Sequence, residues 1–170
     1  MPPIVIVQHM PPQFTGPLAG RLDSISALSV REAAQGDVLQ PNGVLLAPGG
    51  RHLQLLRRGS TVKITLNDEE AVSGHKPSVD VMMLSAAMAF GPNCLGVIMT
   101  GMGRDGADGC RAIRKAGGYV LGQDESSSDV YGMNKVAFIE GNVNQQMSLS
   151  DAATTIAKQL RRLGCALATA

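Results

Sequence analysis

The sequence is poor in aromatic residues and carries almost no net charge. Its 170 residues include no tryptophan, two tyrosines and three phenylalanines. Bases of single-stranded nucleic acid therefore find few rings on which to stack. Fifteen lysines and arginines face fourteen aspartates and glutamates, which gives a formal net charge of +1 and no basic patch. Both absences argue against nucleic acid as a partner.

Cysteines and long apolar runs are also scarce. The three cysteines show no metal-ligand spacing, and an odd count argues against a disulfide framework. Cys94 falls in an apolar strand and Cys110 in a helix, so we interpret both as small core residues. No metal and no cofactor is expected. The sequence shows neither a signal peptide nor an apolar run of membrane-spanning length, so we expect no direct membrane insertion and a cytoplasmic location.

Short apolar runs alternate with helical patterns along the whole chain. This order predicts an α/β fold of three layers, with a mostly parallel, Rossmann-like sheet, helices on both faces and one inserted antiparallel β-hairpin. The length fits a single domain over residues 1–170. Strands are expected near 4–7, 30–33, 44–47, 95–99 and 119–123, the hairpin at 52–66, and helices near 14–25, 78–89, 106–115, 132–140 and 148–163. Methionines 82, 83 and 88 of the second helix are expected in the core.

Two of the predicted strands end in polar residues that suggest chemistry. The run Ile4–Val7 ends in Gln8 and His9, and the run 95–99 leads into a glycine-rich turn that contains Asp105. Open α/β sheets place their sites at the carboxyl ends of strands. His9 is therefore a candidate general base and Asp105 the carboxylate that orients it. The sharp turn into the following helix exposes backbone N–H groups that can hold a developing oxyanion.

Other interpretations of these residues stay open. Gly101-x-Gly103-x-x-Gly106 matches the dinucleotide-binding glycine pattern, with Asp124 or Glu125 at ribose-binding distance. Against it, a carboxylate inside the turn would repel a pyrophosphate. In a purely structural interpretation the glycines make a tight turn, Asp105 caps the helix, and His9 is a core histidine. His52 and His75 lie on or beside loops, and no spacing suggests a metal site.

Five stretches in one order resemble the methylesterase domain of the chemotaxis protein-glutamate methylesterases, the CheB family. The resemblance implies hydrolysis of methyl esters on receptor glutamates, with possible deamidation of glutamines, and methyl-accepting chemoreceptor cytoplasmic segments as partners. It implies that His9 is the general acid/base, that Asp105 orients it, and that the N–H of Met102 holds the oxyanion. The stretches are Ile4–Pro12, Ala47–His52, His75–Asp80, Thr100–Ala107, and Gln123–Ser126 with Tyr131–Met133.

The sequence departs from this family in one respect: it contains no counterpart of the nucleophilic serine. The family carries its serine in a Gly-x-Ser-x-Gly-Gly turn after a strand that would precede Met1, and no Gly-x-Ser-x-Gly occurs in the 170 residues. Ser73 and Ser78 offer no substitute, and Ser126 to Ser128 lie in a polar loop. We therefore expect an N-terminally truncated domain without a receiver domain, inactive or weak alone. Loss of an interior strand would expose two strand edges and an apolar strip. The alternative is a non-catalytic receptor-docking or regulatory module.

Overall fold

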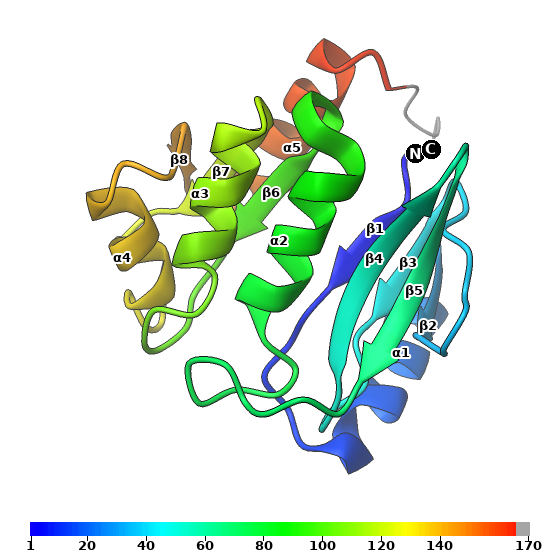
Figure 1. The fold of residues 1–170 in the computed structure, drawn as a ribbon. Helices are drawn as coiled ribbons and strands as arrows, with labels where there is room; N and C mark the ends of the chain where they lie inside the picture. Colours follow the sequence, from blue (N-terminus) through cyan, green and yellow to red (C-terminus); the bar gives the residue numbers. More distant parts are fainter. Residues whose placement is uncertain (166–170) are drawn as a thin grey trace.

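The computed structural model describes residues 1–165 and contains three small sheets and five α-helices within that range (Figure 1). Strands and helices alternate over most of the chain, as the sequence pattern predicts. In chain order the elements are β1 (Ile4–Ile6), α1 (Pro12–Ile25), β2 (Ser29–Glu32), β3 (Gly43–Leu46), β4 (His52–Arg58), β5 (Thr61–Asn67), α2 (Val79–Phe90), the 3-10 helix η1 (Gly91–Asn93), β6 (Leu95–Ile98), α3 (Ala107–Lys115), β7 (Tyr119–Gln123), α4 (Met133–Ile139), β8 (Gln145–Met147) and α5 (Ala152–Arg162).

Two of the sheets are parallel and the third is the predicted hairpin. Strands β1, β3 and β2 pair in that order, and β6, β7 and β8 form the second parallel sheet. β4 and β5 pair along seven residues each, around a turn in which Gly59 has a φ of 61°. That left-handed conformation suits glycine, which has no Cβ to clash with the backbone.

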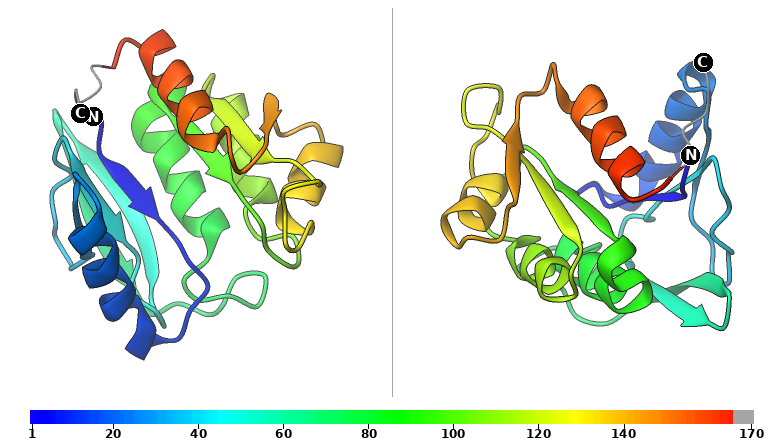
Figure 2. Two further views of the ribbon diagram at one scale, coloured as in Figure 1. Left: turned by 180° about the vertical axis from the view of Figure 1, so that it is seen from behind. Right: turned by 90° about the horizontal axis from the view of Figure 1, so that it is seen from above.

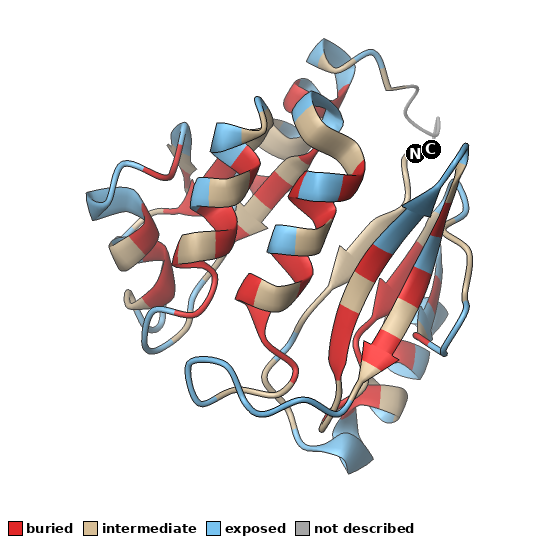
Figure 3. Ribbon diagram, viewed as in Figure 1, coloured by how far each residue is buried: buried red, intermediate tan, exposed pale blue. Residues whose placement is uncertain are grey.

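Helices, joined by the hairpin beside the β1-β3-β2 sheet, cover the two faces of the parallel sheets, which gives the three layers (Figure 2). Most buried apolar side chains form one cluster, where α2, α3, α4 and the hairpin meet one face of the strands. On the other face, α1 packs on β1, β2 and β3, while α5 packs on β6 and β7. Figure 3 shows the buried residues along the inner sides of these elements. The core thus fixes the strand ends from which the candidate site is built.

The two parallel sheets do not pair with each other. β1, which pairs only with β3, and β6, which pairs only with β7, are the edge strands that lead to His9 and Asp105. No strand of residues 1–165 lies between these two edges (Figure 2). Ile4 and Ile6 on β1, and Leu95 and Val97 on β6, are only half-buried although each packs against a core cluster. The structure therefore has the two open edges and the apolar strip that the sequence led us to expect.

Three local expectations need correction. Met88 is 89% exposed, because it lies on the side of α2 opposite the buried Met82 and Met83. β8, only three residues long, lies where the sequence pattern indicated a turn. The last helix begins at Ala152 rather than Ser148, since Ser148 instead accepts a hydrogen bond from the backbone N–H of Asp151. Across residues 1–165, none of the helices combines the length and the apolar character needed to cross a membrane.

Candidate active site

His9 and Asp105 meet at the carboxyl ends of β1 and β6. The Nε2 atom of His9 lies 2.7 Å from Oδ2 of Asp105, although 95 residues separate them along the chain. The His9 side chain is 22% exposed, whereas that of Asp105 is fully buried. A histidine open to solvent on one side and held by a buried carboxylate on the other has the arrangement of a base and its orienting group.

The start of α2 surrounds the Asp105 carboxylate with hydrogen-bond donors. The Ser78 hydroxyl donates to Oδ1 over 2.7 Å, the Val79 N–H to Oδ2 over 2.7 Å, and the Asp80 N–H to Oδ1 over 3.0 Å. Burial by itself raises the pKa of Asp105, but the bonds from His9 and from these three donors outweigh it and lower the pKa to about 2. The free N–H groups at a helix start favour an anion there. Asp105 is thus a fixed negative charge.

The pairing decides which nitrogen of His9 can accept a proton. An ionised carboxylate only accepts hydrogen bonds, so Nε2 carries the hydrogen that points to Asp105. The lone pair of the neutral imidazole then lies on Nδ1. In the serine-protease triad the carboxylate holds Nδ1 and Nε2 is the base, so the two nitrogens of His9 are arranged in the opposite sense.

The turn that contains Met102 is held from outside by the segment before α4. The N–H of Gly101 donates to the carbonyl of Val130 over 3.0 Å, and the N–H of Met133 donates to the carbonyl of Gly101 over 2.7 Å. Gly132 lies against the turn so closely that a Cβ there would sit 2.5 Å from the Gly101 oxygen. Met102 is 80% exposed, and its N–H donates to no other described residue. A rigid turn with a free N–H can serve as an oxyanion donor.

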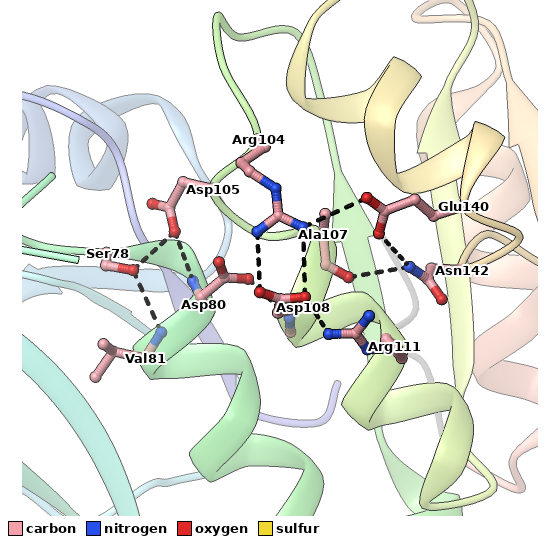
Figure 4. Close-up of polar contacts among 11 residues, drawn as sticks. Ser78, Asp80, Val81, Arg104, Asp105, Ala107, Asp108, Arg111, Glu140 and Asn142 are labelled. Carbon is pink, nitrogen blue, oxygen red and sulfur yellow. Dashed lines mark hydrogen bonds and ion pairs between the residues drawn. The ribbon is translucent and has the colours of Figure 1, made fainter. Parts of the chain in front are cut away.

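Polar contacts also tie the end of this turn to α3. Figure 4 shows Asp105 directed to the start of α2, and Arg104 directed to Asp108 and Glu140. Arg104 is exposed, and its guanidinium pairs with Asp108 over 3.0 Å and with Glu140 over 3.4 Å. Asp80 is buried, and its Oδ1 accepts the N–H of Gly109 over 2.7 Å. The start of α2 therefore forms hydrogen bonds both with the Asp105 carboxylate and with α3.

Comparison with known proteins decides the family. A family model described as CheB methylesterase matches residues 1–156. The chain belongs to the CheB methylesterase family. The "protein-glutamate methylesterase/protein-glutamine glutaminase" of Moorella thermoacetica is 52% identical over 154 residues, which cover 90% of this chain and 36% of that protein. The protein of the same name from Treponema denticola is 48% identical and covers 91% and 41%, respectively. The chain thus spans less than half the length of these two curated relatives.

A solved structure gives the same result for the fold. The crystal structure of the Thermotoga maritima CheB methylesterase catalytic domain superposes with a TM-score of 0.91 at 36% identity. The match covers 94% of this chain and 85% of that one. The three-layer α/β fold with a mostly parallel arrangement and an inserted hairpin is therefore confirmed as that of a CheB catalytic domain.

Within this CheB domain, the serines near the site are engaged in local structure. The hydroxyls of Ser126 and Ser127 donate to the Asp124 carboxylate, and that of Ser128 donates to the Asp124 carbonyl. Ser78 donates to Asp105 itself. Among the described residues, His9 forms its one side-chain hydrogen bond with Asp105 and none with a serine.

The two buried cysteines, Cys94 and Cys110, are equally unsuited to act as nucleophiles. Burial raises the pKa of Cys94 to about 11 and that of Cys110 to about 12. Both therefore carry neutral thiols, and neutral buried thiols are inert. Their assignment as core residues is confirmed by their burial.

Three alternative roles remain to be compared with the structure: helix capping by Asp105, dinucleotide binding at the glycine turn, and metal binding. Asp105 caps α2, not the helix that follows it, because its carboxylate bonds to Val79 and Asp80. Its carboxylate is thereby engaged at α2, and the family match leaves no support for a dinucleotide at the glycines. No group of three or more His, Cys, Asp or Glu side chains within residues 1–165 could hold a metal ion.

Sequence reasoning missed two residues of this CheB site. Ser78 contributes a donor to Asp105, and His75 lies with its ring flat against that of His9, with the centroids 3.7 Å apart and the planes within 4°. Both belong to the stretch His75–Asp80 that carried the family resemblance, which was the available signal. His52 is buried and satisfied: Nε2 contacts the Glu70 carbonyl over 2.9 Å, and Nδ1 accepts the Ser78 N–H over 3.2 Å.

Proposed function

We propose that this chain is the larger part of a protein-glutamate methylesterase catalytic domain that uses a Ser-His-Asp mechanism. The observation that carries the proposal is the hydrogen bond from His9 to a buried, ionised Asp105 beside the turn of Met102. His9 takes the proton of an attacking hydroxyl at Nδ1, Asp105 stabilises the imidazolium, and the Met102 N–H holds the oxyanion of the tetrahedral intermediate. His9 then returns the proton to the leaving methanol.

The proposed substrates rest on the relatives' names for the reacting groups and on the CheB family for the chemoreceptors that carry them. The curated relatives are named protein-glutamate methylesterase and protein-glutamine glutaminase. Glutamate methyl esters and glutamines of methyl-accepting chemoreceptors are therefore the proposed substrates, and the chemoreceptor cytoplasmic segments are the proposed partners. An enzyme acting on those segments works in the cytoplasm. The same acyl-transfer chemistry serves both groups, since each passes through a tetrahedral intermediate with one developing oxyanion.

The open edges of β1 and β6 indicate where a strand that carries the nucleophilic serine would fit. Both strands run parallel to their neighbours and lead to His9 and Asp105 at the same end. A strand inserted parallel between them would end between His9 and the Met102 turn. A helix following it would cover the half-buried side chains of Ile4, Ile6, Leu95 and Val97. We therefore place the serine turn on a segment outside the 170 residues that fills this gap.

The test is methanol release from methyl-labelled receptor membranes. The purified chain is compared with a chimera in which the segment preceding the matched region in the Moorella relative is joined to Met1, and each is paired with its His9→Ala variant. We expect background release from the chain alone and release from the chimera that His9→Ala abolishes. A folded but inactive chimera overturns the assigned mechanism. Robust, His9-dependent release by the chain alone overturns the placement of the nucleophile.

A non-catalytic docking module is the second candidate. The absence of a nucleophile from the 170 residues motivates it. Under this hypothesis the chain binds receptor cytoplasmic segments with equal affinity whether residue 9 is histidine or alanine, and the chimera releases no methanol. Binding without hydrolysis in both proteins is the outcome that selects this function over the esterase.

A further inference from the structure

We propose that His75 is a positioning residue for the general base His9, which rests on the proposed function. The imidazole of His75 lies parallel to that of His9, with ring centroids 3.7 Å apart and an interplanar angle of 4°. This contact acts on the face of the His9 ring, whereas the bond to Asp105 acts in its plane. The two contacts therefore restrain the His9 ring in two perpendicular directions.

The backbone holds His75 firmly enough to act in this way. Val72 and His75 exchange two backbone hydrogen bonds, of 3.1 and 2.9 Å, across a two-residue turn. Ser73 and Gly74 at the centre of this turn have φ values of 53° and 80°. Two central residues with positive φ are typical of the tightest turns. The next residue, Lys76, accepts the Gly50 N–H over 3.1 Å.

Among residues 1–165, stacking on His9 is the aromatic contact that the His75 ring makes. Neither of its nitrogens forms a hydrogen bond with any of residues 1–165. The His75 ring therefore contacts His9 through its flat face and not through a nitrogen. The same short segment supplies Ser78 and Val79 to the Asp105 carboxylate. One segment thus acts on both members of the His9–Asp105 pair. It holds the Asp105 carboxylate by hydrogen bonds and the His9 imidazole by stacking.

The consequence concerns the Nδ1 lone pair. Rotation of the His9 side chain would break the Nε2 contact with Asp105 and turn Nδ1 away from the position of an attacking hydroxyl. A catalytic group is effective only when neighbours lock its side-chain conformation. Stacking supplies that lock without a hydrogen bond that would compete for Nδ1.

The first test is a spectroscopic measurement on the 170-residue chain and needs no hydrolysis. Long-range proton–nitrogen spectra of the imidazoles at about pH 9, above the usual imidazole titration range, report the tautomer and the solvent exchange of the Nε2 proton. We expect the Nε2–H form with slow exchange in the wild type. His75→Ala should accelerate exchange roughly threefold to tenfold, the effect of losing one aromatic pair. His75→Phe should restore the wild-type behaviour.

Two further variants keep this test decisive. His75→Leu replaces the ring by an apolar side chain that is not flat, in case the alanine variant does not fold. Val72→Ala changes an exposed residue of the same turn and should leave the His9 signals unchanged. An unchanged tautomer and exchange rate in folded His75→Ala or His75→Leu overturns the proposal. So does a phenylalanine variant that behaves like alanine, because the nitrogens rather than the flat face would then matter.

A kinetic measurement on the chimera complements the spectra. We expect His75→Ala to lower kcat about tenfold with KM within about twofold, and His75→Phe to recover most of kcat, since the effect lies on the base and not on substrate binding. Equal kcat for the alanine variant and the wild type contradicts the proposal. An inactive wild-type chimera contradicts the proposed esterase function instead, and the spectra then decide the role of His75 alone.

Discussion

At the scale of single residues, Asp105 shows how a fully buried carboxylate stays charged. An isolated buried charge is strongly unfavourable unless hydrogen bonds replace its water. Asp105 accepts four such bonds, from His9, Ser78, Val79 and Asp80. Two of the donors are backbone N–H groups at the start of α2, which have no partner within their own helix. The site carboxylate and the helix cap are therefore one structure.

Replacing this carboxylate should disable the base. Asp105→Asn presents an N–H group to Nε2, which favours the imidazole tautomer with its hydrogen on Nδ1 and removes the lone pair that accepts the proton. In a serine-protease triad the equivalent change lowers kcat about 10⁴-fold. We expect a decrease of that order in methanol release by the chimera.

The matched control is Asp37→Asn. Asp37 is also a hydrogen-bonded carboxylate, paired with Arg31 between β2 and β3, and its pKa is also lowered, first by the bond from Arg31. Its replacement should leave the rate within about twofold, as is usual for surface positions. Equal rates for the Asp105→Asn chimera and the wild type would refute the orienting role.

Asp105 should also make stability depend on pH in acid. Its folded-state pKa of about 2 lies below the ordinary value of 3.8. A group with a depressed folded pKa contributes stability that is present above the unfolded value and is lost as the pH falls through the folded one. We expect about 2 kcal/mol of unfolding free energy to disappear between pH about 4 and pH about 2. Urea unfolding of wild type and Asp105→Asn across this range measures the difference.

The comparison of the two proteins isolates Asp105 together with its effect on Asp80, whose pKa is raised first by burial and also by the nearby charge of Asp105. Asp37, Asp108 and Asp124 also have lowered pKa values, but they are present in both proteins and their contributions cancel. The advantage of the wild type should therefore shrink as the pH falls. A constant advantage down to pH about 2 means that Asp105 is not ionised in the folded state.

At the scale of elements, the turn of Met102, the proposed oxyanion donor, is shaped by close contact with the segment that begins α4. A Cβ on Gly132 would lie 2.5 Å from the carbonyl oxygen of Gly101 and 3.1 Å from Cα of Met102. Gly132→Ala should therefore push the turn away and misplace the Met102 N–H. We expect at least a tenfold lower kcat in the chimera and a loss of about 1–3 kcal/mol of stability, as for overpacked sites.

Gly20→Ala is the control for a glycine without such contact. Gly20 lies on the exposed side of α1, and nothing stands within 4 Å of its ideal Cβ. Alanine there should stabilise the helix by about 0.5–1 kcal/mol and leave kcat unchanged. If Gly132→Ala has the same small effect as Gly20→Ala, the close approach does not set the geometry of the turn.

The limits of sequence reasoning also appear at this scale. Residue patterns predicted the long helices, the hairpin and the strands that lead to His9 and Asp105, because hydrophobic periodicity is a local property. The stacking of His75 on His9 joins residues 66 positions apart and leaves no periodic trace. Met88 was misplaced because α2 is apolar on most of its surface, so its pattern does not tell the inner face from the outer one. β8 is too short for alternation to be visible.

At the scale of the whole molecule, two half-sheets flank a position that no strand of residues 1–165 occupies. His9 follows one open edge, and Asp105 follows the other. The His9–Asp105 hydrogen bond therefore joins the segments that follow two sheets that do not pair. Open, half-buried edges are templates for another strand. The proposed nucleophile segment would complete the sheet and the catalytic triad in one step.

Hydrogen exchange tests this arrangement directly. In the 170-residue chain, the β1 and β6 amides that face the gap should exchange quickly, since exposed backbone groups open at little cost. In the chimera the inserted strand should pair with them and slow their exchange at least about tenfold. β7 pairs on both sides, with β6 and β8, and its amides should be slow in both proteins. Equally slow exchange at the open edges of the dilute chain would mean that they are already paired, and the serine segment would then need another place in the molecule.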